Sequence, residues 1–203
     1  TDSGTLTLGS PVSITSGGLD INDQGTFDMS SNDVTISTGT FNAASDVTYQ
    51  NAGLINVSSG GNIDTNGNAT TDAGTAVPEL QVSDASTLQN DLSVSSLLDI
   101  DNALADGGNT ITLSGDAELD ADINGAGTLQ ATGSNKIEAE SDVSVRAVTI
   151  DSDGTVQFAT DDGQNPRTFT VNGTFTHTKG AVEIGDNDIN ISSQTYDYTA
   201  GTY

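Results

Sequence analysis

The sequence predicts an all-β protein that folds as a three-sided parallel β-solenoid, also called a parallel β-helix. Three observations predict this class. Aspartate outnumbers glutamate by 24 to 5, short apolar–polar–apolar triplets recur along the chain, and these triplets return in phase about every 21 residues. Aspartate favours turns and disfavours helix interiors, so the acidic residues themselves argue against α structure.

The triplets occur in two forms. One begins with glycine, as in Gly25–Met29 (GTFDM) and Gly39–Ala43 (GTFNA), and the other lacks it, as in Val12–Ile14 (VSI) and Val34–Ile36 (VTI). Because side chains alternate along a strand, each triplet turns two apolar side chains to one face and a polar one to the other. Such a triplet buries nothing alone and needs a neighbour stacked on it.

The spacing of the triplets indicates how they stack. Val12 to Val34, Leu19 to Phe41 and Val34 to Leu54 are steps of 20 to 22 residues, each spanning three triplets. This is one turn of a three-sided solenoid, and about nine or ten coils fit into the chain. A sandwich of hairpins ranks second, because it would normally have longer strands. Low hydrophobicity with high net charge also leaves disorder as a rival.

We expect one solenoid domain over residues 1–203. The period weakens between residues 66 and 107, where the sequence predicts irregular coils or a protruding loop. A helical turn at Leu97–Ala105 and a subdomain boundary near Pro78 are alternatives there. A second loop is expected at residues 161–166.

The charge excludes some classes of partner. The formal net charge is −25, with only 4 basic residues, so the chain repels nucleic-acid backbones and anionic lipid. No run of 18 apolar residues is present, so we expect no membrane insertion. The absence of cysteine excludes disulfides and thiolate metal sites.

The residues offer little catalytic machinery. His177 is the only histidine, and its phase within a strand marks it as an ordinary strand residue. We therefore expect that the protein is not an enzyme. Paired carboxylates keep a polysaccharide-active enzyme open as an alternative, although among 29 acids some pair always has a suitable gap.

Calcium is the one metal that the sequence suggests. The candidate ligands are two Asp-x-Asp pairs, Asp151 with Asp153 and Asp186 with Asp188, since closely spaced carboxylates suit hard cations. The first pair fails as an EF-hand loop, because Thr160 stands where a bidentate glutamate is needed. These aspartates are interpreted as corner formers, and no cofactor is expected.

The GTFxA and VTI phrases resemble those of bacterial surface β-helix proteins, such as autotransporter passengers and filamentous-haemagglutinin-like adhesins. The resemblance extends over most of the chain but rests on no diagnostic motif. It implies a right-handed parallel β-helix that lies outside the cell or on its surface and acts as a stalk, fibre or adhesin.

The two ends are the predicted assembly sites. A solenoid end exposes unpaired strands, and neither end carries an amphipathic capping helix. Self-association into a filament, by end-to-end stacking or strand exchange, is therefore the first functional hypothesis. Alternatively, the chain is part of a longer solenoid, or irregular coil covers its ends. An adhesin module for a glycan or a surface ligand is the second hypothesis. The predicted assembly residues are Thr5, Leu6, Leu8, Tyr196, Tyr198 and Tyr203.

Overall fold

The computed structural model describes residues 4–21, 25–43, 47–58, 62–64, 76–160, 167–185 and 189–199. Within these residues every strand pair is parallel and no helix occurs. The predicted all-β parallel solenoid is therefore confirmed. For the described residues, the hairpin sandwich, the disordered chain and the helical turn at Leu97–Ala105 are wrong.

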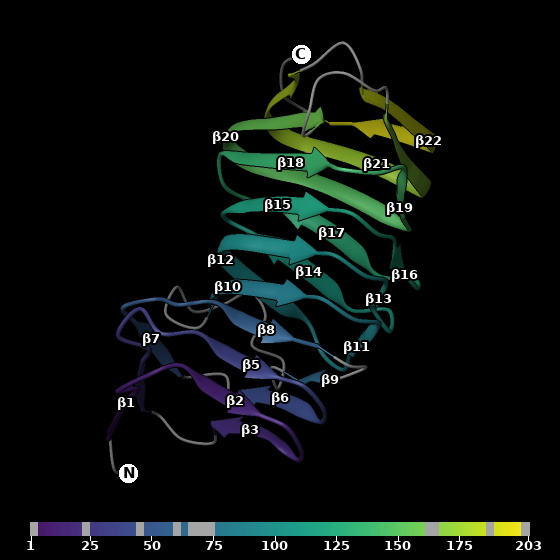
Figure 1. Ribbon diagram of the computed structural model, residues 1–203. Coiled ribbons are helices and arrows are strands. Elements are labelled where there is room, and N and C mark those ends of the chain that lie inside the picture. The colour runs from purple at the N-terminus through teal and green to yellow at the C-terminus, as the bar shows by residue number, and fades with distance from the viewer. Residues whose placement is uncertain are drawn as a thin grey trace.

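The solenoid has three faces, which we call A, B and C in the order in which the chain reaches them (Figure 1). Face A contains β1 (Thr5–Thr7), β4 (Thr26–Asp28), β7 (Thr48–Gln50), β14 (Thr110–Leu113) and β17 (Thr128–Ala131). Face B contains β2 (Val12–Ile14), β5 (Val34–Ile36), β8 (Ile55–Val57), β15 (Asp116–Leu119) and β18 (Asn135–Ala139). Face C contains β3 (Gly18–Ile21), β6 (Thr40–Ala43), β9 (Asn62–Asp64), β11 (Ser86–Leu88), β13 (Leu104–Ala105), β16 (Ile123–Asn124) and β19 (Val143–Val145).

Longer strands bend round the corners between faces. β10 (Val77–Val82), β12 (Leu92–Ile100) and β20 (Ala147–Thr160) pass from face A to face B. β21 (Arg167–Ile184) covers faces C, A and B in turn, and β22 (Ile189–Tyr198) covers C and A. In Figure 1 the face-B strands cross the front from left to right while the chain climbs from bottom to top, so the coil is right-handed.

The register along face B gives the coil length. Successive Cα partners run from Val12 to Ile184 in eight steps, which cover 172 residues, an average of 21.5 per coil. The predicted 21-residue period is confirmed. We call each level of the stack a rung. The described residues form nine rungs on face B, joined by eight complete turns, against the nine or ten coils predicted.

Residues 76–107 differ from the irregular region that the sequence predicts. They form β10 to β13, each paired in parallel with the coils above and below, with one register shift between Val77 and Glu79 beside Pro78. The coil from Leu80 to its partner Leu98 is only 18 residues long, and this shorter step hides the period in the sequence. Residues 65–75, with most of the predicted loop, lie outside the described part of the chain, as do residues 161–166.

One narrow core runs through all the coils. The inward side chains form a single buried cluster from Phe27 to Val182. Aromatic rings contact one another within it: the Phe158 ring centroid lies 5.3 Å from that of Phe169, edge to face, and 5.9 Å from that of Phe175, in a tilted arrangement. Since each side chain packs against its partners one coil above and below, the cluster is continuous along the solenoid axis.

Aspartate side chains tie successive coils together at the corners. In each case the carboxylate accepts a hydrogen bond from a backbone N–H about one coil further along the chain, at 2.6–3.1 Å. The aspartates are Asp33, Asp91, Asp106, Asp116, Asp122 and Asp142. This bonding satisfies backbone donors where the strands are interrupted, and it gives the aspartate bias a structural role.

Candidate assembly surfaces

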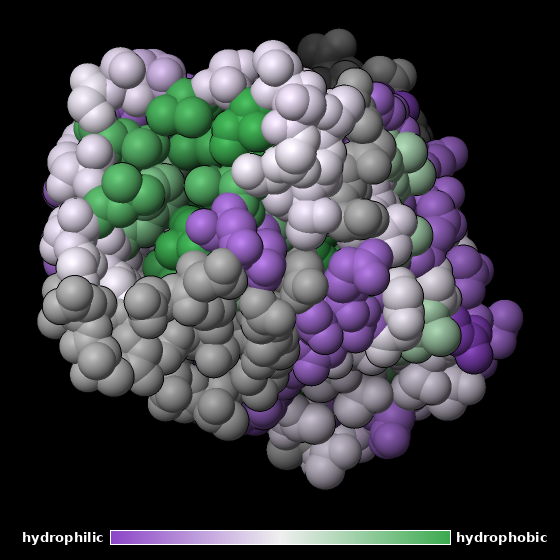
Figure 2. Space-filling model, turned by 90° about the horizontal axis from the view of Figure 1, so that it is seen from below, coloured by the Kyte–Doolittle hydropathy of each residue, from purple (hydrophilic) through white to green (hydrophobic). Residues whose placement is uncertain are grey.

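The N-terminal end of the core is open among the described residues. Leu6 on face A is 55% exposed, and five further apolar side chains of the first rung are only partly buried. These are Leu8, Val12, Ile14, Leu19 and Ile21. Their equivalents one coil higher, such as Phe27 and Val34, are buried. Figure 2, seen from this end, shows apolar side chains gathered in one patch.

The C-terminal end of the core has a hollow of about 640 Å³. Phe175 and Tyr196 line it on face A, and Val182, Ile184 and Ile191 line it on faces B and C, with Gln157, Glu183, Gly185 and Ser193 completing it. Ile184 is 51% exposed and Tyr196 is 45% exposed. The hollow is the continuation of the solenoid core at its last described rung.

The backbone at both ends is paired on one side. β1, β2 and β3 are the terminal strands of their sheets, and β22 pairs only with β21 within the described residues. A strand with one neighbour presents a row of N–H and C=O groups that a further parallel strand can use. Within the described residues, each end thus combines apolar side chains with strands that have a neighbouring strand on one side only.

Tyrosines and the single histidine organise the upper part of face A. Tyr196 stacks on Phe175 at 5.3 Å with an interplanar angle of 25°, and Tyr198 contacts His177 edge to face at 5.4 Å. The His177 ring is buried, with Nε2 3.3 Å from Gly180 O and Nδ1 3.4 Å from Tyr196 Oη. A neutral ring protonated on Nε2 satisfies both contacts, donating to the carbonyl and accepting from the hydroxyl. His177 is therefore a buried residue within β21, in keeping with the prediction that it is an ordinary strand residue.

The predicted assembly residues divide between the two ends. Thr5, Leu6 and Leu8 lie at the first rung and Tyr196 and Tyr198 at the last described rung, while Tyr203 lies outside the described residues. The two groups are therefore not one site. They are opposite ends of the same core, separated by the length of the solenoid.

The two candidate calcium pairs differ in what the structure describes. Asp186 and Asp188 lie outside the described residues. At the other pair, the ammonium of Lys179 lies 2.9 Å from Asp153 Oδ1 and 3.8 Å from Asp151 Oδ1, so the two carboxylates share one positive charge. In the described part of the chain no three His, Cys, Asp or Glu side chains are placed to hold a metal ion. Calcium binding stays a prediction.

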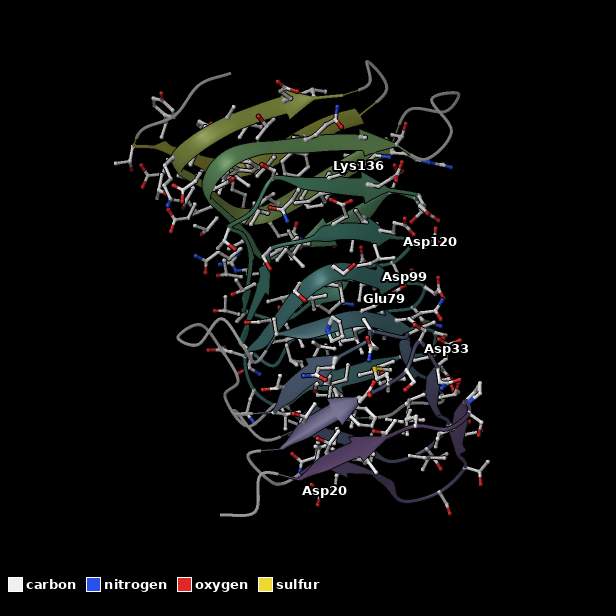
Figure 3. The ribbon with its side chains drawn as sticks, turned by 90° about the vertical axis from the view of Figure 1, so that its left-hand side faces the viewer. Asp20, Asp33, Glu79, Asp99, Asp120 and Lys136 are labelled. Carbon is white, nitrogen blue, oxygen red and sulfur yellow. The ribbon has the colours of Figure 1, made fainter. Side chains whose placement is uncertain are left out.

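A column of acidic side chains follows the outer side of face B. Asp99, Glu118 and Glu138 are register partners in consecutive rungs. Gln81 Nε2 donates to both Asp99 and Asp101, at 3.0 and 2.9 Å. Burial, together with the charges of Asp101 and Glu118, raises the pKa of Asp99 to about 6. Figure 3 shows Glu79, Asp99, Asp120 and Lys136 at successive heights along this side.

Sequence reasoning missed both the column and the aspartates that link coils. For the links a signal exists: Asp33, Asp91, Asp116 and Asp142 each directly precede the first inward-facing residue of a strand. For the column, the signal is the recurrence of an acidic residue about once per coil, at positions 99, 118 and 138. Both signals become visible only once the coil register is known.

Comparisons of the chain with protein-family models, with curated proteins and with solved structures find no match. The described residues contain no helix long and apolar enough to cross a membrane.

Proposed function

We propose that the protein is a structural segment of an extracellular filament, stalk or surface fibre, and that its solenoid ends are the assembly surfaces. The observation that carries the proposal is the pair of open ends on one continuous core. Each end exposes apolar side chains at inward positions that the rungs between them bury, apart from the partly buried Tyr49 and Ala121. A second copy stacked head to tail would supply the missing rung at each end.

The distribution of charge supports end-on rather than sideways contact. The chain carries a net charge of −25, and acids such as Asp99 and Glu118 lie on its flank. Two such flanks repel one another within a screening length of about 8 Å at physiological ionic strength. The apolar ends carry the hydrophobic driving force for contact. We therefore expect association to strengthen as salt is added.

The test is analytical ultracentrifugation and negative-stain electron microscopy over a range of protein and salt concentrations. Linear particles longer than one solenoid are expected. Val12→Asp and Ile184→Asp, one at each end, should abolish them, because each places a charge in the junction. Thr149→Asp on the outside of face A adds the same charge and should not. A strictly monomeric protein at high concentration would overturn the proposal.

A second candidate is an adhesin module that binds a neutral glycan. The hollow at the C-terminal end combines the rings of Phe175 and Tyr196 with the polar groups of Gln157, Glu183 and Ser193. Sugar rings stack on aromatic faces while their hydroxyls bond to polar neighbours. The test is binding to a glycan array. If the protein stays monomeric, binds a glycan and loses this binding in Tyr196→Ala, the adhesin function is favoured over the filament.

A further inference from the structure

Face A contributes one more strand segment than the other faces. Among the described residues, nine segments lie on face B, from β2 to residues 181–184 of β21. Nine lie on face C, from β3 to residues 189–193 of β22. Ten lie on face A, from β1 to residues 195–198 of β22, with Val77 marking the fourth. The described chain therefore starts and ends on the same face.

This surplus decides how two copies can meet. The coil visits each face once per turn, so a strand stacked next along the coil after residues 195–198 lies on face B. A second copy supplies it if its β2 stacks on residues 181–184 and its β3 stacks on residues 189–193. Its β4, one coil above β1, then lies directly on residues 195–198. The β1 of that copy would occupy the place already filled by residues 195–198.

We propose, on the basis of the proposed function, that in the head-to-tail junction residues 195–198 of one copy replace β1 beneath β4 of the next. The second copy's β1 leaves its own solenoid. The junction then continues the coil without a gap on any face, so the filament is one uninterrupted β-solenoid with a repeat of nine rungs.

β1 is the weaker of the two competing segments. All three of its residues are exposed, and among the described strands it pairs with β4 alone. Residues 195–198 continue a ten-residue strand, and two of their side chains are held by ring contacts, Tyr196 to Phe175 and Tyr198 to His177. Thr199 N also donates to His177 O at 2.9 Å. The exchange therefore releases β1, which makes fewer contacts in its own solenoid than residues 195–198 make in theirs.

The side chains at the junction fit their new neighbours. In the isolated chain Leu6 is the register partner of Phe27, whose ring contacts Tyr49 edge to face at 6.2 Å. Tyr196 in the place of Leu6 would join the pair Phe175–Tyr196 to the pair Phe27–Tyr49 in one aromatic column. Aromatic pairs contribute beyond the area that they bury.

One contact opposes the exchange. Asp197 takes the place of Thr7 and comes beside Asp28 on the outer side of face A. Like charges on directly adjacent strands are destabilising, and salt screens the repulsion. This agrees with the expectation that assembly strengthens as salt is added.

A disulfide lock tests the exchange, because the protein has no cysteine of its own. Thr7 and Asp28 are register partners, so Thr7→Cys with Asp28→Cys fastens β1 to β4 when oxidised. The locked protein should remain monomeric and should form filaments after reduction. The matched control is Thr26→Cys with Thr48→Cys, which fastens β4 to β7 and leaves β1 free to leave. It should assemble in both states.

A second pair reports the register across the junction. Ser13→Cys with Glu183→Cys places two thiols on adjacent rungs only between copies, because within one copy they lie eight rungs apart, about 38 Å at about 4.8 Å per rung. Oxidation should give a ladder of covalent oligomers, and Thr35→Cys with Glu183→Cys, one rung out of register, should give none. Two results would overturn the exchange alone. One is filament formation by the oxidised Thr7→Cys, Asp28→Cys protein, and the other is the absence of covalent oligomers when filaments of the Ser13→Cys, Glu183→Cys protein are oxidised. Absence of any assembly by the unmodified protein would overturn the proposed function as well.

Discussion

Asp106 Oδ1 accepts hydrogen bonds from two glycines, Gly108 N in its own turn at 2.7 Å and Gly127 N in the next coil at 3.0 Å. The Asp106 side chain is buried, with 1% of the residue exposed, and it fills the corner beneath Gly125 and Gly127. One carboxylate thus closes a turn and joins two coils.

We expect Asp106→Ala to lower the free energy of unfolding by about 1–3 kcal/mol, because it leaves buried backbone donors without an acceptor. Asp106→Asn keeps an oxygen in place and should lose clearly less. Urea denaturation followed by circular dichroism measures both. Equal stability of the alanine variant and the unmodified protein would show that water replaces the carboxylate.

Gly125 tests the same corner from the other side. Its φ of +145° is unfavourable for other residues, and an added Cβ would collide with the Asp106 carboxylate. Gly125→Ala should therefore destabilise by about 1–3 kcal/mol. Gly9→Ala serves as the control, because nothing lies within 4 Å of a Cβ there. If the two substitutions lowered the melting temperature equally, the steric argument would be wrong.

The acidic column predicts a pH-dependent stability. The pKa of Asp99 is raised in the folded protein to about 6 from 3.8, so the folded state binds the proton more tightly than the unfolded chain. Stability from this group is therefore full below about pH 4 and is lost as the pH rises through 6. Asp99→Asn should be more stable than the unmodified protein at pH 7, by on the order of 1 kcal/mol after solvent screening, and equally stable at pH 4.

Urea titrations of the two proteins at pH 4, 5.5 and 7 measure this difference. Asp84→Asn, an acid near the start of β11, is the control for a general loss of negative charge. A stability gain for Asp99→Asn that is the same at all three pH values would contradict the prediction.

Loss of an aromatic ring should mainly lower stability in the core and mainly weaken assembly at the C-terminal end of the solenoid. Phe158 is fully buried between Phe169 and Phe175, so Phe158→Ala should cost about 3–5 kcal/mol. Tyr198 is 47% exposed, so Tyr198→Ala should cost much less stability while weakening assembly. Thermal unfolding and sedimentation of both variants separate the two effects. Weakened assembly in neither variant would remove Tyr198 from the junction.

Much of the fold could be predicted because the signal is local and repeated. Triplets such as Val12–Ile14 and Val34–Ile36 became β2 and β5 and pair in the register that their 22-residue spacing indicates. The prediction was poorest where the step changes: Leu97 to Ala105 is rich in leucine and lies where the coils shorten to 18 and 19 residues, yet it forms the end of β12 and β13. A helix signal and a compressed solenoid coil look alike when the period is not yet known.

The candidate site was predicted only as a list of residues. Leu6 and Tyr196 were both assigned to assembly, but the competition that we propose between them for one position on face A depends on counting segments around the coil. A single inserted or lost segment between them would change that relationship without altering either residue.

The sequence by itself determined the class of fold, the coil length and which side chains face inward, because alternation and period are properties of neighbouring residues. The tertiary structure decided which aspartates bond to the next coil, which acids share a column and which face the first and last described strand segments share. These depend on the summed length of every coil between two positions. Contacts between coils arise from stacking, and the register of a stack is known only when every coil is in place.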